Sequence, residues 1–221
     1  MPVVLLCIFS GCKAGGKTKT SSPEENFSKE ASYALGMNVG TSLKTDNLYP
    51  NMDEFIQGIQ DVLSDAKLRY SNEEAFQVFS EAYRSLAEKR DEKNRQAEND
   101  FLTENSKKPG VTVTGSGLQY EVISEGYGPK PTAADTVKVH YEGALTNGTV
   151  FDSSYERGEP IEFPLGGVIP GWTEGLQLMS VGSKYRLIIP SNLGYGSQGA
   201  GQEIPPYSTL VFQVELLDIV Q

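Results

Sequence analysis

Histidine and cysteine are scarce in this sequence, and their positions exclude several kinds of site. The only histidine is His140, and the two cysteines, Cys7 and Cys12, both lie within the first twelve residues. The body of the chain therefore has no cluster of soft ligands for a structural zinc ion, and we expect neither a metal nor a cofactor. No apolar run reaches the ~18 residues that a membrane-spanning helix requires.

Positive charge is also in short supply. The chain has 19 Lys and Arg against 29 Asp and Glu, which gives a formal net charge of −10 and a pI of about 4.7. A surface this acidic repels phosphate backbones, so nucleic acid is not an expected partner. The length of 221 residues allows one or two folded domains.

The N-terminus has an apolar stretch, Pro2 to Phe9, followed by Ser10-Gly11-Cys12. This order resembles a bacterial lipoprotein signal, in which the cysteine is lipidated after cleavage. The apolar core is short and follows no Lys or Arg, so a disordered apolar tail is the alternative. We favour export, with residues 1–12 as a signal segment, lipidation at Cys12, and residues 13–27 as a flexible tether. The expected location is the cell envelope and periplasm, at the outer membrane, held by the lipid anchor only.

Residues 28–105 have a helical pattern. An apolar stripe repeats every four residues from Ala31 to Leu43, and a small-residue stripe of Ser32, Gly36 and Gly40 runs beside it. Asn51 and Ser71, each followed by a glutamate three residues later, are typical of helix starts. A helix from Ser71 to Asn105 would be roughly 50 Å long. Its stretch from Glu88 to Asp100 is so charged that we predict a solvated connecting helix.

These helices offer little apolar core to a single chain. Pairing with a second copy would bury the exposed stripes, so the pattern favours a homodimer formed through residues 28–105. A small monomeric bundle packed on the C-terminal domain is the alternative.

Pro109-Gly110 ends the helical pattern, and the apolar period changes to two in residues 111–221. Alternation predicts strands around Leu118 to Val122, Val137 to Tyr141, and Leu210 to Leu216. Lys184 to Ile189 reads as a further short strand. Asn147-Gly148 indicates a hairpin turn, and only Trp172 to Met179 reads as a helix. We therefore predict an α+β fold, with an antiparallel sheet and one short helix across it.

Aromatic residues of this domain lie at strand ends or beside glycine-rich loops, where side chains tend to line open pockets. They fall within VHYEGALTNGTVFDSS (Val139 to Ser154), FPLGGVIPGW (Phe163 to Trp172) and GYGSQGAGQEIPPYSTLVF (Gly194 to Phe212). The pattern alone does not decide whether these aromatic residues form part of the core or line a pocket.

These three segments resemble the FKBP-type peptidyl-prolyl isomerases, and the resemblance covers about Thr114 to Val220. The whole chain is similar to the macrophage infectivity potentiator subgroup of that family, whose members are homodimers joined through N-terminal helices. The segments YALGMNVGTSL and FIQGIQDVL match its dimerisation region. The resemblance implies an isomerase that acts on proline-containing polypeptides and binds tacrolimus- or rapamycin-type inhibitors.

The resemblance also assigns the site. It implies catalytic roles for Asp152, Tyr195 and Trp172, with Trp172 beneath the proline ring and Tyr195 donating to the substrate carbonyl. Arg157 matches an arginine that pairs with the aspartate. The remaining substrate-binding residues implied by the family are Tyr141, Phe151, Ile161, Val168, Ile169, Ile204 and Phe212.

The sequence departs from the family at two places in this pocket. An aromatic residue is common where Ile161 stands, and a histidine is common within the segment Gly199-Ala200-Gly201. Both changes bear on drug affinity and sequence preference. His140 alternates with Val139 and Tyr141, so we predict that it faces away from the pocket and serves in packing or hydrogen bonding.

X-Pro rotation needs no covalent chemistry, because an apolar pocket disfavours the polar planar amide relative to the twisted one. The predicted function is therefore isomerisation of X-Pro bonds during the folding of exported proteins. An envelope chaperone that uses the same pocket without turnover is the alternative.

Overall fold

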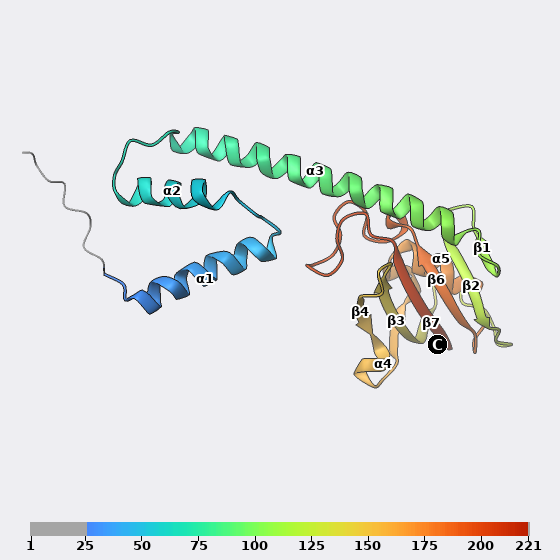
Figure 1. The fold of residues 1–221 in the computed structure, drawn as a ribbon. Helices are drawn as coiled ribbons and strands as arrows, with labels where there is room; N and C mark the ends of the chain where they lie inside the picture. Colours follow the sequence, from blue (N-terminus) through green and yellow to red (C-terminus); the bar gives the residue numbers. More distant parts are fainter. Residues whose placement is uncertain (1–25, 221) are drawn as a thin grey trace, which may run out of the picture. The chain divides into compact units, whose positions relative to one another are not determined.

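The computed structural model describes residues 26–220, which fall into two compact units that divide between Val78 and Phe79 (Figure 1). The predicted signal segment, Cys12 and most of the predicted tether lie outside the described residues. Within residues 26–220, no helix combines the length and the apolar character that crossing a membrane requires.

The first unit contains α1 (Lys29–Thr45), α2 (Met52–Leu63) and the first turns of α3 (Asn72–Asn105). Both predicted helix starts are confirmed. The Glu54 N–H donates to Asn51 Oδ1 at 3.1 Å. At α3 the Glu74 N–H donates to Ser71 Oγ at 3.2 Å, while the Ser71 N–H donates back to Glu74 Oε2 at 2.8 Å. This reciprocal pair is a capping box, which satisfies two backbone donors at the helix end.

The apolar residues of α1 and α2 are not covered by their own chain. Neither helix contains a buried residue, and Leu35, Ile56 and Phe76 are all largely exposed. The glycines of the small-residue stripe also face open space, since a Cβ at Gly36 or Gly40 would meet no atom within 4 Å.

The second unit is built on one antiparallel sheet of seven strands in the order β1-β2-β6-β7-β3-β4, with β5 also paired to β3. The strands are β1 (Val111–Val113), β2 (Gln119–Ser124), β3 (Thr136–Leu145), β4 (Val150–Ser153), β5 (Ile161–Pro164), β6 (Lys184–Ile189) and β7 (Leu210–Val220). The predicted turn joins β3 to β4, where Gly148 has φ +87° and its N–H donates to the Leu145 carbonyl at 2.9 Å.

One short helix, α5 (Pro170–Leu178), lies against this sheet. Glycine makes the approach close, because a Cβ at Gly171 would lie 2.4 Å from Ile189 and one at Gly175 would lie 2.7 Å from Leu187. Leu176 and Leu187 are fully buried in the core between the helix and the sheet. The predicted α+β class is confirmed.

The second half of α3 belongs to the same unit as the sheet, and its contacts correct one prediction. Much of the stretch from Glu88 to Asp100 is exposed, but Asn94 and Glu98 are half-buried. Both side chains make hydrogen bonds to the segment between β6 and β7. At the end of the helix Asn105 is buried, and its Nδ2 donates to Gln119 Oε1 at 2.8 Å. The solvated-face prediction is wrong for this side of the helix because its contacts are polar, which an apolar periodicity does not detect.

Candidate active site

A cavity of about 720 Å³ opens in the second unit, between the sheet, α5 and the loop before β7. Most of its lining is aromatic or aliphatic, and two carboxylates lie in it, on Asp152 and Glu203. Its lining residues are Tyr141, Phe151, Asp152, Ile161, Phe163, Gly167, Val168, Ile169, Trp172, Tyr195, Ala200, Gly201, Glu203, Ile204 and Phe212.

Trp172 lines this cavity and is almost fully buried, with 5% of its surface exposed. Its ring meets the rings of Tyr141 and Phe212 edge to face, each with centroids 5.1 Å apart. Such arrangements suit the quadrupoles of aromatic rings. Trp172 Nε1 is buried and has no hydrogen-bond partner among the described residues.

The local sequence explains why these rings converge. Pro170 occupies the first turn of α5, where its fixed φ suits a helix start, and Trp172 follows in the same turn. On β7, Phe212 is opposite Gly143 of β3. A Cβ at Gly143 would lie 2.5 Å from the Phe212 ring and 2.8 Å from the Phe151 ring. The missing side chain at Gly143 therefore leaves the space that both rings occupy.

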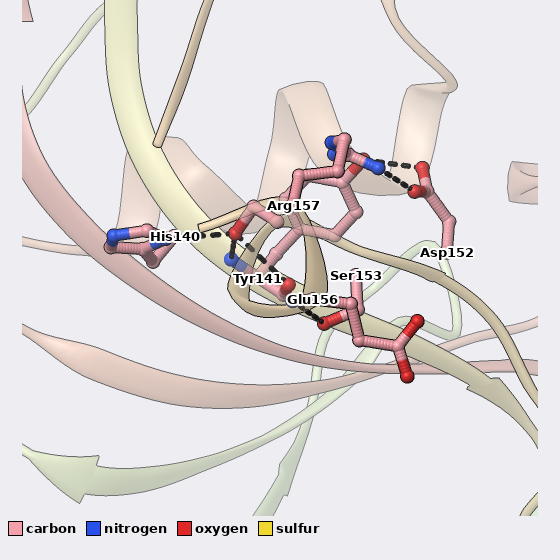
Figure 2. Close-up of polar contacts among 7 residues, drawn as sticks. His140, Tyr141, Asp152, Ser153, Glu156 and Arg157 are labelled. Carbon is pink, nitrogen blue, oxygen red and sulfur yellow. Dashed lines mark hydrogen bonds and ion pairs between the residues drawn. The ribbon is translucent and has the colours of Figure 1, made fainter. Parts of the chain in front are cut away.

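One polar group of three residues lies at the edge of the cavity. The Tyr141 hydroxyl and the Arg157 guanidinium both donate to the Asp152 carboxylate (Figure 2). Arg157 also donates to the Tyr141 hydroxyl oxygen at 2.9 Å. Arg157 ends α4 (Ser154–Arg157), a single helical turn that Ser153 caps and that directly follows β4, the strand that carries Asp152. The turn thus brings Arg157 back over the strand that carries its partner.

The contacts of this group set its protonation. Burial acts to raise the pKa of Asp152, but the hydrogen bonds from Tyr141 and Arg157 outweigh it and leave the pKa below the ordinary value. Burial, followed by the hydrogen bond to Asp152, raises the pKa of Tyr141. The carboxylate is therefore ionised and the phenol protonated at neutral pH. An ionised carboxylate that already accepts two hydrogen bonds is a poor proton acceptor, so the arrangement favours binding and electrostatics over acid–base chemistry.

His140 lies outside the cavity lining, on the other side of β3 from Tyr141, as the alternation predicts. Its Nδ1 is 2.9 Å from Ser154 Oγ, and its ring stacks on Tyr155 with centroids 4.7 Å apart. Ser154 Oγ in turn accepts from the Tyr141 backbone N–H at 2.8 Å. The histidine therefore supports β3 through its contacts with Ser154 and Tyr155, outside the cavity lining.

Comparison with known families decides what kind of domain carries this cavity. The family of FKBP-type peptidyl-prolyl cis-trans isomerases matches residues 128–217, and the family described as the domain amino terminal to FKBP-type peptidyl-prolyl isomerase matches residues 28–122. The chain belongs to the FKBP-type peptidyl-prolyl cis-trans isomerase family. It is thus an enzyme that catalyses cis–trans isomerisation at proline, as the sequence analysis predicts.

Relatives cover most of the chain. The FKBP-type 22 kDa peptidyl-prolyl cis-trans isomerase of Escherichia coli K12 is 47% identical over 204 residues, covering 89% of this chain and 97% of that protein. The "Outer membrane protein MIP" of Legionella longbeachae is 41% identical, covering 85% and 84%. The crystal structure of FkpA from Escherichia coli is 40% identical with a TM-score of 0.71, covering 86% of this chain and 95% of that one.

Within this FKBP domain, the structure brings together the side chains that the sequence analysis assigned to the site. All of them line the cavity except Arg157, which meets it through Asp152 and Tyr141. The sequence analysis missed Phe163, Gly167 and Glu203 as lining residues, whereas Ala200 and Gly201 belong to the segment in which it located a departure from the family. Phe163 was detectable, because it is two residues from Ile161 on β5 and so points to the same face. Glu203 lies in an irregular loop that offers no periodic signal.

Proposed function

We propose that this FKBP-type enzyme accelerates X-Pro rotation in proline-containing, unfolded or partly folded polypeptides, with the aromatic cavity as its catalytic site. The observation that carries the proposal is the aromatic base formed by Trp172, Tyr141 and Phe212 with an ionised Asp152 at its edge. A proline ring is compact and apolar, and a cavity of this chemistry suits it. Tacrolimus- or rapamycin-type molecules would compete for the same space.

The proposed mechanism is non-covalent. Rotation about an X-Pro bond has a barrier of about 18–20 kcal/mol, because amide resonance gives the C–N bond double-bond character. The planar amide is more polar than the twisted one, so a cavity that replaces water with aromatic rings favours the twisted amide. Each 1.4 kcal/mol of this preference would accelerate rotation about tenfold. Ring packing under the proline and hydrogen bonds to the flanking carbonyls would supply several such steps.

In this mechanism Tyr195 donates its hydroxyl to a substrate carbonyl. It lines the cavity and 40% of its surface is exposed. Among residues 26–220, no group is hydrogen-bonded to its hydroxyl, so the donor is available to a bound peptide. Asp152 orients Tyr141 and Arg157 and places a negative charge beside the rotating bond.

The substitution Tyr195→Phe tests this role by removing one hydroxyl. We expect kcat/KM for an X-Pro peptide to fall about fivefold, which corresponds to the ~1 kcal/mol of a typical hydrogen bond. A protease-coupled isomerisation assay measures it. Tyr127→Phe is the matched control, because Tyr127 is 99% exposed and outside the cavity. An unchanged rate in the Tyr195 variant would contradict the assignment.

We further propose that two copies associate through residues 28–105. The support is the uncovered apolar surface of α1 and α2 together with the open glycines Gly36 and Gly40. Small residues spaced by four allow two helices to approach closely, and the match to the family of amino-terminal FKBP domains covers this region.

A larger residue at Gly36 distinguishes a dimer from a monomer. Gly36→Leu improves helix propensity by roughly 0.8 kcal/mol, and a Cβ at this position would meet no atom within 4 Å, so an isolated helix would tolerate it. In a closely packed helix pair it would clash, and we expect light scattering to show monomers. Asn38→Leu, an exposed position elsewhere on α1, is the control. A dimer that survives Gly36→Leu with unchanged dissociation would place the interface elsewhere.

We also propose export and lipidation at Cys12 from the sequence signal, and the similarity to the "Outer membrane protein MIP" of Legionella longbeachae supports an outer-membrane location. The proposed clients are accordingly exported polypeptides of the periplasm. Mass spectrometry of the mature protein tests the anchor, since a lipidated Cys12 would be its first residue. An unmodified mature N-terminus would contradict it.

A further inference from the structure

The segment between β6 and β7 forms one wall of the cavity, and α3 contacts both of its ends. This wall loop comprises residues 190–209 and contributes Tyr195, Ala200, Gly201, Glu203 and Ile204 to the lining. Its interior has little regular structure beyond η2 (Ser191–Leu193) and a two-residue bridge between Ala200 and Ile204. A loop of this length requires external contacts to hold one conformation.

Glu98 holds the first end of the wall loop. Its Oε1 accepts from the Ser191 N–H at 2.5 Å, and its Oε2 accepts from Ser191 Oγ at 2.8 Å. Ser191 is 5% exposed, so this charge-assisted pair is largely shielded from solvent. The Ser191 carbonyl then accepts from the N–H groups of Gly194 and Gly196, at 3.0 and 2.8 Å. These two residues flank Tyr195. Glu98 is therefore connected, through Ser191 alone, to the backbone that orients the Tyr195 side chain.

Asn94 holds the other end. Its Nδ2 donates to the Pro206 carbonyl at 2.8 Å. The next residue of the loop, Tyr207, has φ +58°, a left-handed conformation that is unfavourable for a residue with a side chain. Its ring lies under the Arg95 guanidinium, 4.7 Å from the centroid, and its N–H donates to the Gly196 carbonyl at 2.8 Å. The two ends of the loop are therefore tied to α3 and to each other.

The two anchors act from the same face of the helix. Asn94 and Glu98 are four residues apart, which places them one above the other. Each forms a polar contact with backbone or hydroxyl groups of the loop, and neither lines the catalytic cavity. The burial of a helix against a sheet is driven mainly by apolar contacts, whereas these two contacts are polar and reach the loop and not a strand. Polar contacts aimed at the two ends of a catalytic loop fix its geometry.

We propose that Asn94 and Glu98 are positioning residues for the isomerase reaction, which hold the wall loop so that Tyr195 and Ile204 stay in place around the substrate. This inference rests on the proposed catalytic role of the cavity. It adds that the connecting helix is a functional part of the catalytic domain. Release of the loop would weaken substrate binding first, because part of the binding free energy would then be used to order the wall loop around the substrate.

The test compares the full-length variants Asn94→Ala, Glu98→Ala and the double variant with Glu88→Ala, an exposed carboxylate of the same helix. A misplaced wall can lower kcat/KM by one to two orders of magnitude, and we expect kcat/KM of the double variant to fall about tenfold, mainly through a higher KM. Amide hydrogen exchange at Gly196, Ile204 and Tyr207 should accelerate about tenfold as the loop opens locally, while β7 stays protected. The Glu98→Gln variant keeps an oxygen for the Ser191 N–H and should recover most of the activity.

Three outcomes would overturn the inference: wild-type KM in the double variant, equal loss in Glu88→Ala, or no recovery in Glu98→Gln. If the double variant unfolds, KM and hydrogen exchange of the single variants Asn94→Ala and Glu98→Ala are compared with those of Glu88→Ala instead. Failure of the inference is distinguishable from failure of the proposed function. Tyr195→Phe is expected to lower kcat/KM independently of Asn94 and Glu98. If kcat/KM is normal in the Asn94 and Glu98 variants but reduced in Tyr195→Phe, only the positioning role is refuted. If Tyr195→Phe is also normal, the catalytic assignment of the cavity fails, and the inference fails with it.

Discussion

Replacing Trp172 with alanine is expected to lower kcat/KM by about two orders of magnitude and the free energy of unfolding by about 3–5 kcal/mol. The indole is 95% buried and packs against Tyr141, Phe163 and Phe212 at centroid distances of 5.1–5.3 Å. Its removal takes the base from the cavity, so the proline ring loses its packing surface. Urea titration followed by circular dichroism measures the free energy of unfolding. Tryptophan fluorescence cannot be used for the variant, because Trp172 is the only tryptophan of the chain.

Trp172→Phe separates the two effects of this change. Phenylalanine keeps an aromatic base, and it removes the buried Nε1 donor that lacks a partner among the described residues. A buried donor without an acceptor is unfavourable by about 1–3 kcal/mol, which offsets part of the lost contact area. We therefore expect Trp172→Phe to be far closer to wild type in both stability and kcat/KM. Equal damage in the two variants would show that a smaller aromatic ring cannot replace the indole, and would contradict an aromatic base as the essential feature.

Asp152→Ala is expected to lower kcat/KM by about tenfold to hundredfold, since it removes the acceptor shared by Tyr141 and Arg157 and the ionised group at the cavity edge. Without the carboxylate, the hydroxyl of the buried Tyr141 keeps only its contact with Arg157. The Tyr141 ring also packs on Trp172, so its displacement would reach the base of the cavity. An isomerisation assay and a thermal melt, taken together, would distinguish lost turnover from lost folding.

The pH profile shows whether Asp152 transfers a proton. The pKa of Asp152 is lowered below its ordinary 3.8, so the contribution of its contacts to stability is present above that value and is lost only as the pH falls through the lowered pKa. The pKa of Tyr141 is raised above its ordinary 10.0, so it stays protonated below that value. Between about pH 5 and pH 9 neither group changes charge, and kcat/KM should be flat. A bell-shaped profile that disappears in Asp152→Asn would instead assign Asp152 to acid–base catalysis.

Long periodic elements of this fold were predictable from the sequence. The helix starts at Asn51 and Ser71 followed from capping chemistry alone, and Lys184–Ile189 was predicted with the bounds that β6 has. The strands β1, β4 and β5 were not predicted, because three or four residues are too few to establish a period of two. The single-turn helix α4 was missed for the same reason, although it is what returns Arg157 to Asp152.

The candidate site was predictable mainly through family resemblance. Composition and spacing could not decide whether the aromatic residues belong to the core or to a pocket. In the structure Tyr141 and Trp172 belong to both, because they are deeply buried and also line the cavity. No periodic pattern relates Asp152 to Arg157, which are five residues apart across a strand end and a turn. The docking of α3 was missed because its contacts are polar. Asn94 and Glu98 look like solvated residues unless their partners in the wall loop are known.

The division between the two units, inside α3 and not at its end, bears on how the catalytic domain is isolated. A cut near residue 107, where the sequence changes from helix to strand, would strip Ser191, Pro206 and Gln119 of their helix partners. A cut near Phe79 retains all of these contacts and leaves out the uncovered helices. A version of this enzyme that keeps these contacts therefore begins within α3, before Asn94. We expect ligand screening on a fragment that starts after α3 to sample a looser cavity than the one in the full chain.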